Sequence, residues 1–315
     1  MSAIPSPASR PVVAIAGATG HLGKNIATAL LSTLFRDQFS EVILLSRNGS
    51  SPTFPGLDAR FLVRKYDENN LAEALEGVQV LVNAVGPSGH SFKEKIVEAI
   101  PQTDVQLYFP SEFGVDHYLH DFVHSEWDQK KKHFHLTQQL LSPKIRVCRV
   151  FCGLFLDDSI GPWFGFNTVN GKYESVGSSD TGISFTSLED VGKTVASLAS
   201  LPAESVPKTL HIGGDTHSFS EIASIMEAAG AGRIEVTETP LQKYKAETTR
   251  TTSWDPANYL RFLMGEGKIN HTVGHLGCDN ELVNPKQELW QWRKLTDLAK
   301  ETKGQPWKDL PWPPQ

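Results

Sequence analysis

The sequence predicts an α/β fold that is built on a doubly wound parallel sheet. Two observations lead to this prediction. Short apolar runs rich in Val, Ile and Leu alternate with segments whose apolar residues recur at helical spacing, without a break from residue 12 to residue 151. The first apolar run also ends in a cluster of glycines, and a helical pattern follows directly. Strands that are buried on both faces of a parallel sheet have this continuous apolar character.

The first strand and helix occupy residues 12–31, and a glycine turn joins them. Gly17 permits a sharp bend, Gly20 lets backbone N–H groups approach a pyrophosphate, and Gly23 allows the helix to pack closely on the strand. The start of the helix adds unpaired N–H donors and the positive end of its dipole. The spacing G-x-x-G-x-x-G is a variant of the fingerprint of Rossmann-type dinucleotide sites. We therefore expect a bound dinucleotide; the alternative is a tight turn without a ligand.

The second strand begins at Glu41 and ends in a turn that contains Ser46 and Arg47. In a Rossmann-type sheet the end of this strand reaches the adenosine ribose. An acidic residue there binds the 2′-hydroxyl of NAD, whereas an arginine suits the 2′-phosphate of NADP. Arg47 with no acidic neighbour therefore predicts NADPH, and the alternative is an ordinary solvated arginine.

The later segments continue the alternation. We expect strands at 61–67, 78–86, 105–109, 145–151 and 210–215, a strand-to-helix junction at 183–192, and helices at 71–75, 92–100, 126–141, 195–201, 220–229 and 286–299. Ser218 and Glu221 have the spacing of a capping box, which is a structural feature. The Trp- and Pro-rich residues 305–314 are expected to form a strap whose Trp rings pack on the body.

Two strand ends are expected to lie beside the cofactor, because ligands of open α/β sheets bind at the carboxyl ends of strands. The fourth strand ends in Val85 and Gly86, and the fifth is followed by Pro110, Ser111, Glu112 and Phe113. Further along, residues 161–166 are rich in aromatic rings. Such a loop either fills the core or forms the wall of an apolar pocket.

A lysine run lies on the helix expected at 126–141. Trp127, Phe134 and Leu141 recur at a seven-residue spacing and predict one inward stripe. Lys130 and Lys131 fall on or beside this stripe, and Lys132 points further away. A lysine run usually forms a solvated helix face, but this spacing allows one of the lysines to point inward.

Composition excludes several classes of protein. The chain has 315 residues and a net charge of −6 without a basic stripe, which argues against a nucleic-acid partner. No apolar run approaches the ~20 residues of a membrane span, and the leader at residues 1–10 has no secretory h-region. The three cysteines predict neither a disulfide nor a zinc site. We expect a cytoplasmic protein; a homodimer stays open.

With these motifs in place, the chain resembles the isoflavone reductase-like, NmrA-like branch of the atypical short-chain dehydrogenases, and its ending resembles fungal members more loosely. The residues that carry the resemblance lie between 11 and 230: the Gly17–Gly23 turn, Phe109–Gly114 as the most specific block, the lysine-bearing helix, Gly153–Phe155 and Asp190–Gly192. The resemblance implies NADPH, a small aromatic or polyketide-like substrate, and a catalytic lysine on the helix that follows Pro-Ser-Glu-Phe-Gly.

The position of that lysine is left open within one helical turn. Ungapped counting from Ser111 leads to His133, and a shift of two or three residues leads to Lys131 or Lys130. No tyrosine has a lysine four residues further on, so the familiar Tyr-x-x-x-Lys dyad is absent. The sequence also lacks the Gly-x-Ser-x-Gly and His-Glu-x-x-His motifs, which argues against serine and zinc hydrolases.

The sequence therefore predicts an NADPH-dependent reductase of secondary metabolism, with a general-acid lysine from Lys130, Lys131 and Lys132. A non-catalytic, NADP(H)-sensing regulatory protein is the alternative. Residues 11–155 would form the cofactor-binding domain, and residues 156–315 a smaller substrate-binding portion interleaved with the last strands. The residues expected to bind the cofactor are Gly17, Thr19, Gly20, His21, Leu22, Gly23, Arg47, Val85, Gly86, Pro110, Ser111, Glu112 and Phe113.

Overall fold

A six-stranded parallel sheet forms the centre of the computed structural model, which describes residues 10–54 and 60–308. Its strand order is β3-β2-β1-β4-β5-β6. This is the order of dinucleotide-binding sheets, and it confirms the predicted doubly wound α/β fold. The strands are β1 Val12–Ala16, β2 Glu41–Ser46, β3 Leu62–Lys65, β4 Val80–Asn83, β5 Leu107–Phe109 and β6 Arg146–Val147.

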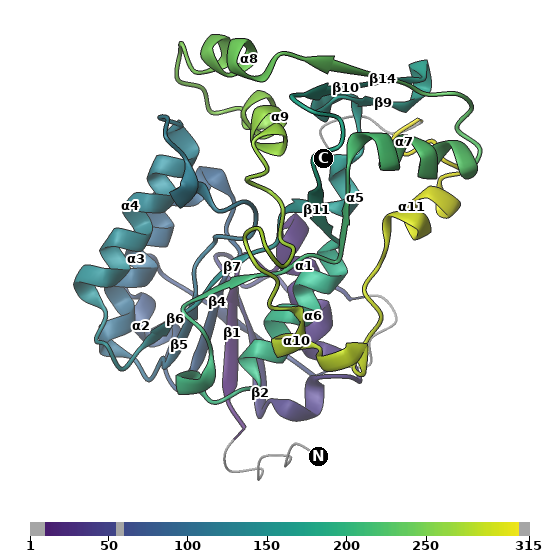
Figure 1. The fold of residues 1–315 in the computed structure, drawn as a ribbon. Coiled ribbons are helices and arrows are strands. Elements are labelled where there is room, and N and C mark those ends of the chain that lie inside the picture. Colours follow the sequence, from purple (N-terminus) through teal and green to yellow (C-terminus); the bar gives the residue numbers. More distant parts are fainter. Residues whose placement is uncertain (1–9, 55–59, 309–315) are drawn as a thin grey trace.

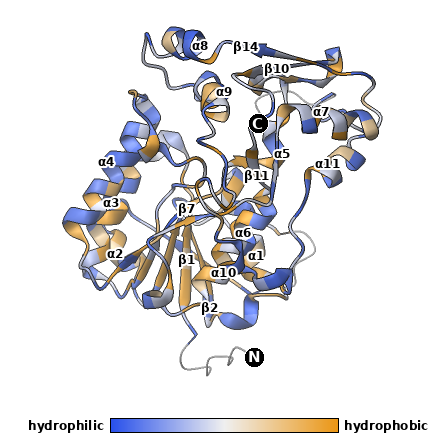
Figure 2. Ribbon diagram, in the orientation of Figure 1, coloured by the Kyte–Doolittle hydropathy of each residue, from blue (hydrophilic) through white to orange (hydrophobic). Residues whose placement is uncertain are grey.

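Helices cover both faces of this sheet (Figure 1). Successive residues of β1 point to opposite faces, so Val13 and Ile15 join one core while Ala14 and Ala16 join another. Figure 2 shows the resulting apolar strands between more polar helices. One face is covered by α1 His21–Leu31 and α6 Leu188–Ala199, and the other by α2 Leu71–Ala74, α3 His90–Ala99 and α4 Ser125–Leu140.

The two helices α1 and α6 pack closely although they are far apart in sequence. Gly192 of α6 permits this contact, since a Cβ at this position would lie 2.5 Å from the carbonyl oxygen of Asn25. Val191 and Val195 of α6 thereby enter the same core as Ile15. The helical layer on this face of the sheet is therefore completed by a helix from the second half of the chain.

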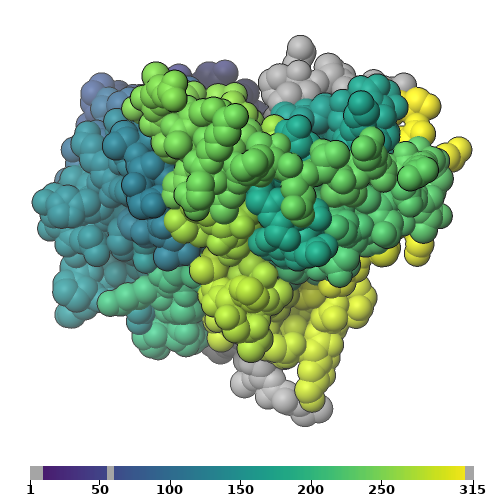
Figure 3. Space-filling model, turned by 45° about the horizontal axis from the view of Figure 1, so that its top comes forward, coloured from purple at the N-terminus to yellow at the C-terminus, as the bar shows by residue number. Residues whose placement is uncertain are grey.

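Most of the remaining elements lie above the carboxyl ends of the parallel strands (Figure 1) and enclose a second core around Phe166, Tyr173 and Phe262. The exceptions are the segments of Val150, Leu210 and Val283, which join the core of Val13 and Ile15 instead. In Figure 3 the light-green C-terminal segments lie against the blue α3–α4 side, where Phe122 contacts Phe262 at a ring distance of 5.1 Å. The remaining elements are β7 Arg149–Phe151, β8 Leu154–Phe155, α5 Leu156–Ser159, β9 Phe166–Asn167, β10 Lys172–Val176, β11 Ile183–Thr186, β12 Thr209–His211, β13 Asp215–His217, α7 Phe219–Ala228, β14 Glu235–Thr239, α8 Leu241–Thr248, α9 Ala257–Gly265, α10 Asn280–Val283 and α11 Leu295–Glu301.

Three expected elements differ from the structure. The strand expected at 210–215 is divided into β12 and β13, which belong to different sheets, with no strand between them. The strand expected at 145–151 is divided into β6, which joins the main sheet, and β7, which pairs with β12 instead. The helix expected at 286–299 is wrong over its first part, because Lys286 and Gln287 have positive φ and α11 begins only at Leu295. Between them, Trp290 and Trp292 insert into the main core from a segment without regular secondary structure.

Smaller predictions agree with the structure. The capping box of Ser218 and Glu221 is present at the start of α7, and all three cysteines are free thiols. Trp307 contacts the ring of Trp163 at 5.1 Å, as expected for the strap, while Trp312 and residues 1–9 of the leader lie outside the described residues. No helix in the described part of the chain is long and apolar enough to cross a membrane.

Candidate active site

The glycine turn between β1 and α1 has the shape that a phosphate site requires. Gly17 has φ +86°, and its carbonyl oxygen accepts a hydrogen bond of 2.9 Å from the N–H of Gly20. A Cβ on Gly23 would lie 2.0 Å from the same carbonyl oxygen, and one on Gly17 would lie 2.7 Å from that of Ala84. No side chain caps the start of α1, so its N–H groups are available to an anion. Thr19 and Gly20 are exposed at this point.

A groove with a volume of about 440 Å³ extends from this turn along the ends of β1 and β2. Gly17, Thr19, Arg47 and Val85 line it, together with Tyr66. The guanidinium of Arg47 is exposed at its mouth and forms an ion pair of 3.3 Å with Glu68. This groove has the position of an adenosine site, and an exposed arginine at its mouth suits a 2′-phosphate.

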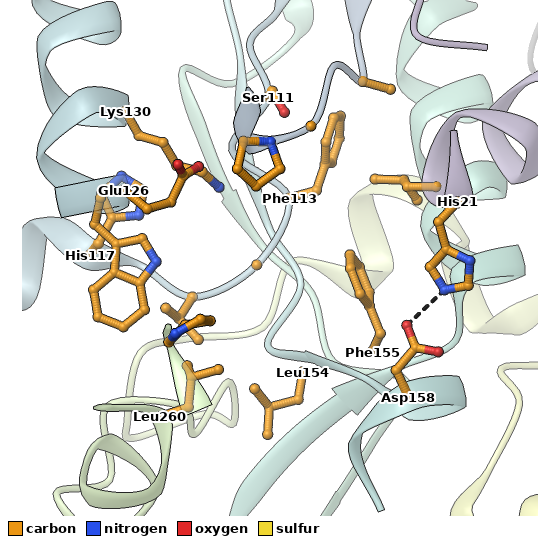
Figure 4. Close-up of a pocket in the computed structure, with 18 of the residues that line it drawn as sticks. His21, Ser111, Phe113, His117, Glu126, Lys130, Leu154, Phe155, Asp158 and Leu260 are labelled. Carbon is orange, nitrogen blue, oxygen red and sulfur yellow. Dashed lines mark hydrogen bonds and ion pairs between the residues drawn. The ribbon is translucent and has the colours of Figure 1, made fainter. Parts of the chain in front are cut away.

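A second cavity with a volume of about 450 Å³ lies on the other side of the turn (Figure 4). Most of its wall is apolar, as in typical sites for small organic ligands. It shares Val85 with the groove, so the two spaces meet at the end of β4. The predicted cofactor residues at this cavity are Gly20, His21, Leu22, Val85, Gly86, Ser111 and Phe113, and its aromatic and aliphatic wall includes Trp127, Leu154, Phe155, Phe164 and Leu260.

Three predicted cofactor residues line neither space. Gly23 lies behind the turn against Gly17, and Pro110 is buried. Glu112 is 1% exposed and forms an ion pair of 3.1 Å with the buried His117. Burial, the largest single influence, would raise the pKa of this carboxyl, but His117, Lys130 and His133 together outweigh burial and lower it. Glu112 therefore holds the loop that follows β5, while the neighbouring Ser111 donates a hydrogen bond of 2.9 Å to the carbonyl oxygen of Val85.

The three lysines of α4 have different surroundings. Lys130 lines the cavity, and its ammonium has no hydrogen bond or ion pair to any described residue. Lys131 instead bonds to Asp128 at 3.3 Å, and Lys132 forms an exposed ion pair of 2.8 Å with Glu94. Among the lysines of this run, Lys130 is thus the one positioned to meet a ligand.

His133, the position reached by ungapped counting, is buried beneath the cavity. Its Nε2 lies 2.9 Å from the hydroxyl of Tyr108, which also accepts a hydrogen bond from Asn83. Burial lowers the pKa of His133 to about 4. A neutral imidazole that is bonded to a buried tyrosine has a structural role between α4 and β5.

A further lysine, Lys93, was not expected from the sequence. It lies on α3, is 2% exposed, and lines the cavity near Lys130. Burial, reinforced by the charge of Lys130, lowers its pKa to about 8. The sequence does contain an indication that Lys93 is buried. At helical spacing, it falls on the same face as Ile96, Val97 and Ile100, all of which are buried.

Two residues that line the cavity, His21 of the glycine turn and Asp158 of α5, form an ion pair. The imidazole Nε2 and the carboxylate are 2.7 Å apart (Figure 4). Trp163 donates a hydrogen bond from its indole to the backbone carbonyl of Asp158. Of the aromatic loop, Phe164 lines the cavity, whereas Phe166 stacks on Phe219 in the second core. Within this loop, Phe166 therefore fills the core and Phe164 forms part of the wall of an apolar cavity.

The model of the NmrA-like family matches residues 9–300. An NmrA-like family domain-containing oxidoreductase of Gibberella moniliformis is 28% identical over 137 residues, which is 42% of this chain and 44% of that protein. A phenylcoumaran benzylic ether reductase of Pyrus communis is 30% identical over 118 residues, which is 35% of this chain and 37% of that protein. These alignments thus span less than half the length of either relative.

Solved structures resemble the chain over nearly its full length. The leucoanthocyanidin reductase of Vitis vinifera in complex with NADPH has a TM-score of 0.71 at 19% identity, covering 93% of this chain and 100% of that one. An isoflavone reductase has a TM-score of 0.72 at 18% identity, covering 93% and 99%. At such low identity the likeness establishes a common fold.

Proposed function

The chain belongs to the NmrA-like family, and we propose that it is an NADPH-dependent reductase of a small aromatic or polyketide-like compound, with Lys130 as the general acid. One observation supports this proposal above the others: the glycine turn and Lys130 line the same apolar cavity. A cofactor held by the turn and a substrate beside Lys130 would therefore meet in one cavity. The reductase names and the NADPH complex among the similar proteins agree with this assignment.

The residues present fit the cofactor. The free N–H groups at the start of α1 would bind its pyrophosphate, and Arg47 would bind its 2′-phosphate. Gly86 and Ser111 border the space for the nicotinamide end. A Cβ placed on Gly86 would have no neighbouring atom within 4 Å. NADPH supplies the hydride when it is bound.

The chain's own residues would align the substrate and handle the proton. Phe113, Phe155 and Trp127 form apolar walls that exclude water from the reacting atoms. The Lys130 ammonium would protonate the oxygen on which negative charge develops as the substrate accepts the hydride. A positioned general acid typically contributes ~10²–10⁴-fold to the rate.

Binding and turnover together test the proposal. Calorimetric titration should show tight binding of NADPH and weaker binding of NADH. With NADPH bound, a panel of aromatic ketones, enones and benzylic ethers should include compounds that the protein reduces, followed by the loss of absorbance of the reduced nicotinamide. Tight NADPH binding without turnover of any compound would favour the NADP(H)-sensing regulator instead.

A lysine pair tests the assignment of the general acid. Lys130→Met should keep the affinity for NADPH and lose turnover by ~10²–10⁴-fold. Lys132→Met is the matched control, because Lys132 lies on the same helix in an exposed ion pair; it should retain turnover. Full turnover of Lys130→Met would refute the assignment.

A further inference from the structure

The proposed reaction leaves one buried charge unused, the ammonium of Lys93. This side chain is 2% exposed and has no hydrogen bond or ion pair to any described residue. It lines the substrate-side cavity, and also a small recess beside it that Ser111, Glu112 and Lys130 share. Nearly every buried charge in a protein is paired, because desolvation without a partner is costly. A buried lysine without a partner in a cavity wall is therefore expected to have a ligand as its partner.

The carboxylates that face Lys93 are already engaged with other groups. Glu126 of α4 bonds to the imidazole of His90 at 2.6 Å. Glu112, in the loop after β5, forms its ion pair with His117. Both carboxylates raise the pKa of Lys93 through their charges, but neither forms an ion pair with it.

The remaining titratable groups around Lys93 add no negative charge. Lys130, from α4, repels the Lys93 ammonium and so lowers its pKa further than burial alone. His133 of the same helix is held in its neutral form by burial. The cavity therefore presents two cations to its interior, and no carboxylate among the described residues pairs with either of them.

The cofactor phosphates are poor candidates for the missing partner. The adjacent residue on α3, Phe92, faces the adenosine groove and stacks on Tyr66, whereas Lys93 faces the other space. Lys93 is grouped there with Trp127 and Lys130, away from the groove that holds Arg47. The glycine turn also borders this cavity, but its His21 lies on the side opposite Lys130 (Figure 4), with which Lys93 shares a recess. This arrangement assigns Lys93 to the substrate side.

We propose that the substrate is an aromatic acid, and that Lys93 binds its carboxylate while the aromatic part lies against Phe113, Trp127 and Phe155. This inference rests on the proposed reductase function and names the class of substrate. The carboxylate would satisfy the buried cation, and the apolar walls would take the ring. Lys130 would then remain free to face the reacting carbonyl or ether oxygen.

A pair of probes with the same ring system, one anionic and one neutral, tests the inference. 2-Naphthoate and its neutral methyl ester are titrated by calorimetry into the protein saturated with NADP⁺. The acid should bind about tenfold or more tightly than the ester, as expected for a charge-assisted hydrogen bond. Its affinity should fall as the pH rises through about 8, where the free protein loses the Lys93 proton; the affinity of the ester should not.

Two variants on the same helix connect the preference to one residue. Lys93→Met should abolish the preference for the acid while leaving ester and NADP⁺ binding unchanged. Lys95→Met is the matched control: Lys95 is 40% exposed and forms an ion pair with Glu68, and its loss should leave the preference intact. Equal binding of both probes to the wild-type protein, equal weakening of both by Lys93→Met, or a loss of NADP⁺ affinity in this variant would each overturn the inference.

The titration with NADP⁺ and NADPH distinguishes failure of the proposed reductase function from failure of the aromatic-acid inference. If neither nucleotide binds, the proposed reductase function fails, whatever the aromatic probes do. If both bind but the protein does not distinguish naphthoate from its ester, the aromatic-acid substrate is refuted while the reductase proposal stands.

Discussion

Replacing Lys93 by methionine should stabilise the free protein. Methionine keeps the length of the stem but removes a charge that is buried without a partner, so the cost of desolvating that charge disappears. The pKa of Lys93 is lowered from 10.5 to about 8 in the folded protein. At about 1.4 kcal/mol for each pH unit, the charged form costs about 3 kcal/mol of folding free energy. For a chain of 315 residues this corresponds to a rise in Tm of about 4 °C.

The pH dependence follows from the direction of this shift. Because the folded pKa is depressed, the unfolded chain binds more protons between about pH 8 and 10.5, and the wild-type protein gains stability as the pH rises through this window. Below about pH 8 the penalty is present in full. The advantage of Lys93→Met should therefore be largest at neutral pH and fall below about 1 kcal/mol at pH 10.

Equilibrium unfolding in urea at pH 7 and at pH 10 measures both effects. Lys95→Met again serves as the control, since loss of an exposed ion pair should change stability by less than about 1 kcal/mol. A Lys93→Met protein that is less stable than wild type at pH 7 would show that burying the Lys93 ammonium does not cost folding free energy. So would an advantage of the same size at both pH values.

Three further substitutions probe other parts of the structure. Gly23→Ala places a Cβ 2.0 Å from the Gly17 carbonyl oxygen; it should weaken NADPH binding by about tenfold or more, and unchanged affinity in calorimetry would contradict the close packing of the turn. Arg47→Ala should lower the affinity for NADPH by about tenfold and leave that for NADH unchanged; an equal loss for both nucleotides would remove the 2′-phosphate role. Asn284→Ala removes the buried amide that donates to the Trp290 carbonyl and accepts from its N–H; it should cost about 2–3 kcal/mol in urea unfolding, and a neutral effect would contradict this role.

The sheet was predictable from the sequence because its strands are buried on both faces. Continuous apolar runs such as 12–16 and 80–83 are typical of buried parallel strands, and the glycine turn marks where the first of these strands ends. The segment around Trp290 was not predictable in the same way. Its apolar residues suggested a helix, but the buried amide of Asn284 holds the backbone in a turn, and a side-chain contact of this kind leaves no periodic trace.

The candidate site was predictable to within a helical turn. Seven-residue spacing restricted the inward lysine to Lys130 or Lys131, and only the tertiary packing of α4 separates them, since Lys131 turns to Asp128. Lys93 was missed because it lies beside Glu94 and Lys95, and a charged run on a helix normally indicates a solvated face. Its spacing with Ile96, Val97 and Ile100 does indicate an inward face, but that α4 packs on α3 and buries the charge follows only from the tertiary structure.

The contact between α6 and α1 has a consequence for thermal unfolding. Gly192 sits against the backbone of α1, and the tryptophans before α11 fill the same core. Each half of the chain thus contributes residues that the other needs, and neither can come apart alone without exposing shared apolar surface. Scanning calorimetry should therefore record one cooperative endotherm for the whole chain, even though the sequence predicts a division into two parts near residue 155.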